Sequence, residues 1–270
     1  MPPDQYDVTD YLFDLRGFVI LKNAVQPELI ERLNKTLDTY LDLEYLQWRG
    51  NVQRFDNNGN AGIELQNIVE GGQAFEELID HPGAHDRLLR YAGEQGTYVE
   101  GLFIDECFAS VRRSGGYFPF HTGSEYGNIR GQYRFINGYF RVGQVNMLLA
   151  LTDIGPGDGG TMVIPGSHKA NIVHPSVKAG WDENQKIDQV EGAYEVHMNK
   201  GDVLLFCDAI SHGASTRTNP GERRVVIYRY GPKWGNTRYG YRYSPELLDR
   251  LTPERRAILE PVPTRKPPSA

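Results

Sequence analysis

The chain has 270 residues, of which 39% are hydrophobic and 11% aromatic, enough for a sizeable core. Its formal net charge is −6 and no basic stripe stands out, which argues against nucleic acid and anionic membrane surfaces as partners. The N-terminus lacks the basic-then-apolar pattern of a signal peptide, and no apolar run approaches the roughly 18 residues needed to span a bilayer. We therefore expect a cytoplasmic protein.

Composition also favours strands and a reducing environment. Glycine (30) and tyrosine (16) are plentiful and methionine (4) is scarce, which is typical of strands and tight turns rather than helical bundles. Cys107 and Cys207 lie in predicted strands and form no CxxC pattern. Both are expected to be small buried hydrophobes in a reduced protein.

The first third of the chain predicts a mixture of helices and loops. A short strand, GFVIL, is expected within residues 11–22. Leucines at four-residue spacing after Pro27 predict a helix over 27–42. The polar, Gly- and Asn-rich residues 47–72 predict a long loop. Short helices are expected over 73–80 and 84–92.

From residue 98 onwards the pattern becomes one of short strands bounded by turn residues. Because long helices do not alternate with these strands, the pattern favours a sandwich or a jelly-roll barrel, with no sign of a domain linker. Two helices are expected near the C-terminus, after the capping signals Ser244-Pro245 and Thr252-Pro253. The expected strands are 98–104, 106–112, 144–151, 161–164, 194–198, 202–206 and 223–230.

Two distant histidines are candidate metal ligands. His121 lies in the segment PFHTGSEYGNI, and His212 follows the apolar strand GDVLLF and a short turn. In a barrel the ends of facing strands meet across the cavity, so both imidazoles can share one ion. Two imidazoles with open positions suit iron, copper or zinc, and an additional carboxylate would specifically suggest non-haem Fe(II) oxygenase chemistry.

An arginine pair follows the second histidine. Arg223 and Arg224 are neighbours on a predicted strand, so their side chains point to opposite faces and only one can face a cavity. A fixed arginine there can hold a carboxylate in bidentate fashion. A dicarboxylate such as 2-oxoglutarate would then bind the metal at one end and this arginine at the other.

Several motifs resemble the phytanoyl-CoA dioxygenase family. GDVLLF, SHGAS and GERR resemble its distal-histidine strand and cosubstrate arginine. LALTDIGPGDGGTMVIPGSHK is similar to its central stretch, and LFDLRGFVILKNAVQPELIERL to its N-terminal strand and helix. The resemblance covers roughly residues 10–232, and PGSHK followed by SHG and RR is its most specific part.

The resemblance implies a mainly β protein with a double-stranded β-helix (jelly-roll, cupin-like) core and flanking N- and C-terminal helices. It implies one domain over 1–270, with a core of about 10–232 and an extension over 233–270. Its cofactors would be Fe(II), 2-oxoglutarate and O₂, used to oxidise, most simply to hydroxylate, an unactivated C–H bond of a small molecule, with succinate and CO₂ as coproducts. Carried over by position, the resemblance makes His121 and His212 the metal ligands and Arg223 the carboxylate clamp, with His168 a structural turn residue.

The chain departs from the family at one position. The family motif is His-x-Asp, whereas Gly123 stands where the aspartate is expected. In one interpretation another carboxylate completes the site: Glu125 is nearest, and Asp105, Glu106 and Asp208 are further candidates. In a second, water or a halide fills the vacated position, as in the related halogenases. In a third, the barrel is a non-catalytic small-molecule-binding protein.

Other residues are candidates for contacts with cosubstrate or substrate. Gln144 and Asn146 lie two apart on one predicted strand, so both amides belong to one face. Ser215 would add a hydroxyl near Arg223. The aromatic residues Tyr117, Phe118 and Phe120 either wall the pocket or belong to the core.

Overall fold

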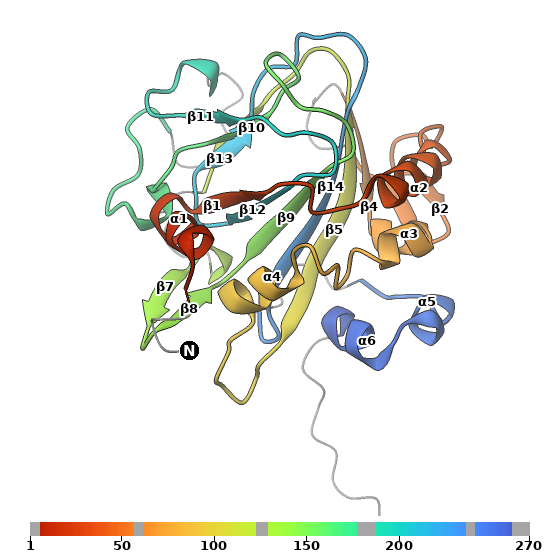
Figure 1. Cartoon of the computed structure of the whole chain (residues 1–270). Coiled ribbons are helices and arrows are strands. Elements are labelled where there is room, and N and C mark those ends of the chain that lie inside the picture. Colours follow the sequence, from red (N-terminus) through yellow and green to blue (C-terminus); the bar gives the residue numbers. More distant parts are fainter. Residues whose placement is uncertain (1–5, 57–61, 123–128, 178–186, 236–240, 261–270) are drawn as a thin grey trace, which may run out of the picture.

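Two antiparallel sheets face each other in the computed structural model, which describes residues 6–56, 62–122, 129–177, 187–235 and 241–260 (Figure 1). The large sheet has the strand order β1-β12-β9-β14-β5-β4-β3-β2. Its members are β1 (Phe18–Leu21), β2 (Trp48–Arg49), β3 (Val52–Arg54), β4 (Gly62–Gln66), β5 (Leu102–Arg112), β9 (Val145–Ala150), β12 (Val203–Cys207) and β14 (Arg223–Pro232).

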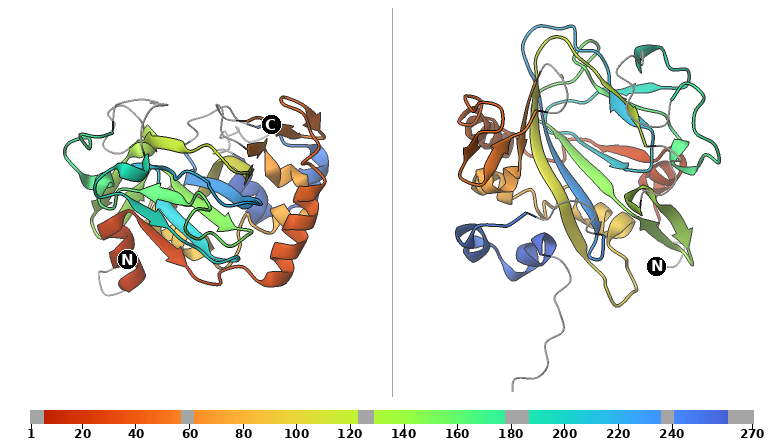
Figure 2. Two further views of the ribbon diagram at one scale, coloured as in Figure 1. Left: turned by 90° about the horizontal axis from the view of Figure 1, so that it is seen from above. Right: turned by 180° about the vertical axis from the view of Figure 1, so that it is seen from behind.

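The smaller sheet has the order β11-β10-β13-β6 and lies over one end of the large sheet (Figures 1 and 2). A separate hairpin joins β7 to β8. The strands of these two units are β6 (Phe118–His121), β10 (Thr161–Val163), β11 (Tyr194–Val196), β13 (His212–Ala214), β7 (Tyr133–Ile136) and β8 (Tyr139–Val142). The predicted fold class, a mainly β cupin-like core with flanking helices, is confirmed.

Helices flank the sheets at both ends of the chain, and their ends follow the capping signals of the sequence. Ser244 and Thr252 each accept a hydrogen bond at the N-terminus of a helix, from the backbone N–H groups of Leu247 and Arg255. The helices are α1 (Val8–Arg16), α2 (Pro27–Asp38), α3 (Gln73–Glu76), α4 (His85–Ala92), α5 (Pro245–Arg250) and α6 (Pro253–Leu259).

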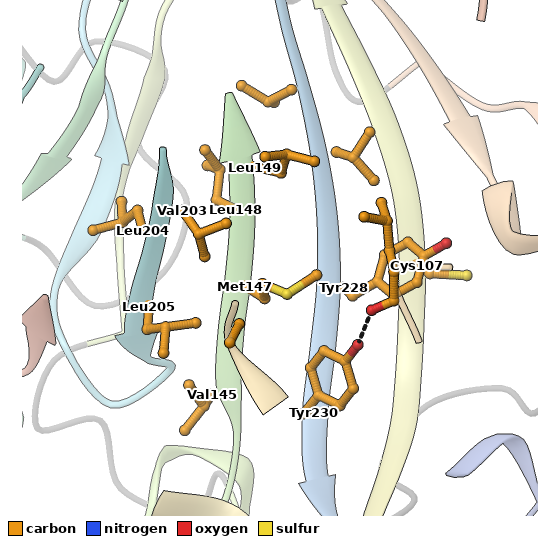
Figure 3. Close-up of a cluster of buried hydrophobic side chains, with 14 of the residues drawn as sticks. Cys107, Val145, Met147, Leu148, Leu149, Val203, Leu204, Leu205, Tyr228 and Tyr230 are labelled. Atoms are coloured by element: carbon orange, nitrogen blue, oxygen red, sulfur yellow. Dashed lines mark hydrogen bonds between the residues drawn. The ribbon is translucent and has the colours of Figure 1, made fainter. Parts of the chain in front are cut away.

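The hydrophobic core lies between the large sheet and the helices. Figure 3 shows its centre, where side chains of β12, β9, β14 and β5 form one continuous apolar layer. Two buried tyrosines of β14 join this layer to the segment around α3. The Tyr228 hydroxyl donates to the carbonyl of Phe75 at 2.7 Å, and the Tyr230 hydroxyl lies 3.0 Å from the carbonyl oxygen of Leu78.

Strand β14 separates the core from the opposite face of the sheet. Val226, Tyr228 and Tyr230 are fully buried in the core, while the residues between them line a cavity on the other face. Alternation of side chains along a strand produces this division. The prediction that Arg223 and Arg224 point to opposite faces is confirmed: Arg223 lines the cavity, and Arg224 pairs outside it with Asp38 at 2.7 Å.

Three sequence-based expectations about elements were wrong. Residues 47–72 are not a loop, because they contain β2, β3 and β4 and a 3-10 helix over Ile68–Gly71. The two strands expected over 98–104 and 106–112 are one strand, β5. Helix α1 was not expected; a capping box between Asp7 and Asp10 begins it, and Gly17, at φ 84°, ends it.

Two further expectations can be compared with the structure. Cys107 and Cys207 are free and buried, as predicted. In the part of the chain that the structure describes, no helix combines the length and the apolar character needed to cross a membrane.

Candidate metal and cosubstrate site

Pairing of β6 with β13 brings the two candidate ligands together. His121 and His212 are direct partners in the register of these antiparallel strands. Their ring centroids lie 4.1 Å apart, and both rings line the cavity. This arrangement agrees with the expectation from the sequence that the two distant histidines meet across a barrel.

Each histidine is oriented in the same way by the backbone. Nδ1 of His212 lies 2.8 Å from the carbonyl oxygen of Ile210, and Nδ1 of His121 lies 3.1 Å from that of Pro119. A carbonyl oxygen only accepts, so each Nδ1 carries the proton and donates it. Nε2 of each ring is then the lone-pair nitrogen available to a metal.

Both imidazoles are held neutral. Burial, together with the neighbouring His212, lowers the pKa of His121 well below its usual value. Burial also lowers the pKa of His212, against the opposing effect of the nearby Asp208 carboxylate. Neutral imidazole is the form that binds metal, so the lowered pKa values suit both rings to ligation.

The cavity has a volume of about 380 Å³ and lies between the small sheet and the face of the large sheet that is turned away from the helices. Its walls combine aromatic and aliphatic side chains with several charged ones. The charged residues among them are Glu64, Glu106, Arg112, Arg130, Arg223 and Arg229.

Arg223 is a buried cation without a carboxylate partner among the described residues. Its Nη2 atom donates a long hydrogen bond, 3.4 Å, to the hydroxyl of Thr161, and its Nε atom has no partner within the described ranges. Burial and the nearby Arg112 and Arg217 lower its pKa to about 9. Arg223 therefore remains charged at neutral pH and is free to bind an anion from the cavity.

The residues present fit a ferrous ion with 2-oxoglutarate. Two neutral imidazoles have ring centroids 4.1 Å apart, and Arg223, whose Nε has no partner among the described residues, lies in the same cavity. Two nitrogens suit iron, and a buried guanidinium suits the distal carboxylate of a dicarboxylate.

The remaining charged groups near the histidines are mostly paired with one another. Glu106 and Arg229 form an ion pair at 2.9 Å. Asp208 accepts from Nε of Arg130 at 3.0 Å and from Nδ2 of Asn146 at 3.4 Å. These pairs limit which carboxylates are available to a metal.

No third protein ligand is evident in the described part of the chain. Gly123 and Glu125 both lie outside the described residues, so the carboxylate assigned to Glu125 stays a prediction. Within the described ranges, no group of three histidine, cysteine, aspartate or glutamate side chains is arranged to hold a metal ion. Of the other candidate carboxylates, Asp105 does not line the cavity, and Glu106 and Asp208 are engaged by arginines.

The structure brings some of the other predicted site residues to the cavity and leaves others outside it. Asn146 lines the cavity, whereas Gln144 donates to Asp105 at 3.1 Å and does not. Ser215 hydrogen-bonds the carboxylate of Glu195 and is not a lining residue either. Phe206 and Phe118 pack edge-on against the rings of His212 and His121, with centroids 4.9 and 5.1 Å apart.

Of the other aromatic candidates, Phe120 belongs to a small second core, against which Tyr117 packs. His168 has the structural role expected of it. Its Nε2 lies 2.9 Å from the carbonyl oxygen of Asp14, and its ring packs edge-on against Tyr133.

Among the cavity residues that sequence reasoning missed are the polar side chains of Glu64, Arg112, Thr161 and Arg229. Arg229 shares its face of β14 with Arg223, because the two lie six residues apart on one strand, so the spacing signal was present. Glu64 was missed because its segment was taken for a loop.

Sequence comparison finds a family model and several curated relatives that the chain resembles. Residues 13–225 match the family model described as phytanoyl-CoA dioxygenase (PhyH). Dioxygenase FUM3 from Gibberella moniliformis is 34% identical over 212 residues, which cover 77% of this chain and 65% of that protein. Dioxygenase himG from Aspergillus japonicus is 24% identical over 229 residues, covering 82% and 66% respectively. The chain thus spans about two thirds of the length of these relatives.

Solved structures agree on the fold. HygX from Streptomyces hygroscopicus, with nickel, 2-oxoglutarate and hygromycin B bound, superimposes with a TM-score of 0.70 at 19% identity, over 84% of this chain and 87% of HygX. An iron-bound HygX structure gives a TM-score of 0.66 at 18% identity, over 84% and 86%. The family model and the curated relatives are dioxygenases, which confirms the expected enzyme class at the level of the family. HygX carries the metal ion and the 2-oxoglutarate that were expected as cofactors. The chain belongs to the phytanoyl-CoA dioxygenase family.

Proposed function

We propose that the protein hydroxylates an unactivated C–H bond of a small molecule. His121 and His212 hold Fe(II) through their Nε2 atoms, and Arg223 binds the distal carboxylate of 2-oxoglutarate. The observation that carries this proposal is the coexistence, in one cavity of about 380 Å³, of a paired histidine site and a buried arginine without a carboxylate partner among the described residues.

When bound, iron and 2-oxoglutarate supply the activation of O₂, with succinate and CO₂ as coproducts. The protein supplies orientation and the exclusion of water. Carbonyls of Pro119 and Ile210 fix the two imidazole tautomers, and Phe118 and Phe206 shield the faces of the site from solvent.

Three further residues were predicted to contact the cosubstrate or substrate, and only one of them lines the cavity. We assign Asn146, which lines the cavity, to direct contact with cosubstrate or substrate. Gln144 and Ser215 act through their neighbours, since they hydrogen-bond Asp105 and Glu195 instead of facing the cavity. A small-molecule substrate is supported by the size of the cavity, and the related HygX has been solved with hygromycin B.

Turnover of 2-oxoglutarate tests this function. With Fe(II), O₂ and ascorbate, the wild-type protein is expected to convert 2-oxoglutarate to succinate, and His121→Ala is expected to abolish the conversion. Exposed His197 provides the matched control, because His197→Ala removes an imidazole outside the cavity. Succinate formation that persists in His121→Ala would contradict the assignment.

Halogenation is the second candidate function, and the absence of the motif's aspartate at Gly123 favours it. A halide at the vacated position would sit beside the iron, and the described residues supply no third ligand there. A Gly123→Asp variant distinguishes the two activities. If the site halogenates, the variant gains hydroxylation and loses its dependence on chloride. If the site hydroxylates, chloride has no effect on wild type or variant.

A further inference from the structure

Glu64 is an acidic side chain in the cavity with no role in the chemistry described above. In the pairing of β4 with β5 it lies opposite Ser110, and Gly62 lies opposite Arg112. Gly62, Glu64 and Gln66 line the cavity, whereas Ile63 and Leu65 are buried in the core. Alternation along β4 therefore directs the Glu64 side chain into the cavity.

The carboxylate of Glu64 has no hydrogen bond or ion pair with any residue that the structure describes. The charged groups around it have other partners. Arg229 pairs with Glu106 at 2.9 Å, and Asp56 pairs with Arg54 at 2.7 Å. The guanidinium of Arg112 donates to three backbone carbonyls, those of Gly159, Gly116 and Ser215.

Among the described residues, the cavity thus holds an acid and a cation, Glu64 and Arg223, that lie on different strands and have no ion-pair partner, while Arg112 is bound by backbone carbonyls. Arg223 is on β14, and Glu64 is on β4, two strands away across β5. At a strand spacing of about 4.8 Å, this separates the two backbones by roughly 10 Å across the sheet. A ligand anion bound at Arg223 leaves the carboxylate of Glu64 free for a second molecule.

A half-buried carboxylate without a partner among the described residues is costly. Desolvation, with the charges of Glu106 and Asp56, raises the pKa of Glu64 to about 7, although Arg229 and Arg112 act in the opposite direction. A bound cation would offset this desolvation cost and restore the ionised form.

A second unpartnered acceptor faces the same cavity. Asn146 is 1% exposed, and its Oδ1 atom has no hydrogen-bond partner in the part of the chain that the structure describes. Its Nδ2 group donates to Asp208, which fixes the amide orientation because a carboxylate does not accept from an oxygen. Glu64 and Asn146 both offer hydrogen-bond acceptors, so the cavity favours a ligand with several hydrogen-bond donors.

We infer that the substrate of the proposed oxygenase carries a basic nitrogen, and that Glu64 binds its ammonium group while Asn146 Oδ1 accepts from a second donor nearer the histidines. This inference rests on the proposed function, since it names the substrate class of that same site. Glu64 is then a specificity-determining residue and takes no part in the chemistry at the iron.

Binding of three ring compounds of one size tests the inference: cyclohexylamine, cyclohexanol and cyclohexanecarboxylate. Affinities are measured by ligand-observed NMR at pH 8, without metal or 2-oxoglutarate. We expect wild type to prefer the amine over the alcohol by at least about tenfold. In Glu64→Gln that preference is expected to fall to within about twofold, and Glu64→Asp should keep part of it.

Matched variants separate this inference from the proposed function. Glu31→Gln removes an exposed carboxylate from α2 and should retain the full amine preference. Arg223→Met should also retain it, although it loses 2-oxoglutarate binding. Wild-type protein that binds amine and alcohol equally, or binds neither, overturns the inference, as does an amine preference that survives in a folded Glu64→Gln. An intact amine preference in a protein that forms no succinate would instead count against the proposed function alone.

Discussion

His121 and His212 are oriented by the same local device. In each case the ring Nδ1 donates to a carbonyl two residues earlier in the chain, that of Pro119 or Ile210. Thr122, at φ 57°, reinforces the arrangement, because its hydroxyl lies 2.7 Å from the Ile210 carbonyl oxygen. Among the described residues, backbone carbonyls and not carboxylates accept from the two Nδ1 atoms, so each ring presents Nε2 to the cavity.

The raised pKa of Glu64 predicts how the stability of the protein depends on pH. Because burial raises the pKa of this carboxyl from 4.5 to about 7, folding favours its protonated form. The ionised form lowers stability: the penalty is absent below about pH 4.5, grows as the pH rises and is complete above pH 7. Glu64→Gln should therefore match wild type at pH 4.5 and exceed it by up to about 3 kcal/mol at pH 8.

Chemical denaturation at the two pH values measures this difference. Glu31→Gln, which removes an exposed carboxylate, is the control and should shift stability by less than about 0.5 kcal/mol at either pH. A Glu64→Gln protein that is less stable than wild type at pH 8 would show that the native carboxylate is well satisfied.

Side chains alternate along strand β14, so the strand has a different role on each face of the sheet. Its residues Arg223 and Arg229 face the cavity, and the tyrosines between and beyond them hold the segment around α3 against the sheet. The arginine pair at the start of the strand therefore offers a test in which two neighbours of identical chemistry have different roles.

Arg223→Met should weaken 2-oxoglutarate binding by at least about tenfold, because it removes a buried, charge-assisted contact. Arg224→Met should leave that affinity within about twofold, since Arg224 pairs with Asp38 and Glu222 outside the cavity. Calorimetric titration of the anaerobic Fe(II) protein with 2-oxoglutarate compares the two. Equal losses in both variants would remove Arg223 from its assigned role.

Tyr228→Phe tests the other face of the strand. The substitution leaves the buried carbonyl of Phe75 without its donor, which should cost about 1–2 kcal/mol of the free energy of unfolding. Tyr98→Phe, at a fully exposed tyrosine, is the matched control and should cost almost nothing. Equal urea midpoints for the two variants would show that this hydrogen bond contributes little.

At the scale of the whole molecule, part of the fold and the main residues of the candidate site could be predicted from the sequence. His121, His212 and Arg223 were predicted from strand ends and from the family resemblance, and all three line one cavity because a barrel brings strand ends together regardless of their separation in sequence. β2, β3 and β4 were missed in part because β4 joins the sheet by pairing with β5, a long-range contact that local composition does not encode, and β3 and β2 extend the sheet from β4.

Some local sequence patterns indicated the correct element, but neighbouring residues favoured a different prediction. Ile63 and Leu65 alternate with Glu64 and Gln66 as a half-buried strand should, yet the Gly- and Asn-rich residues before them favoured a loop. α1 begins with an acidic capping box, Asp7 with Asp10, which the sequence-based prediction did not use. The unpaired state of Glu64 could not be predicted, because it depends on where every neighbouring charge finds its partner.

Anaerobic addition of Fe(II) and 2-oxoglutarate tests the central claim most directly, since it reports the assembled site before any substrate is known. The wild-type protein should develop a visible metal-to-ligand charge-transfer band, and His212→Ala should not, although it remains folded. No band in the wild type, together with no succinate when O₂ is admitted, would contradict the claim that His121, His212 and Arg223 form an iron and 2-oxoglutarate site.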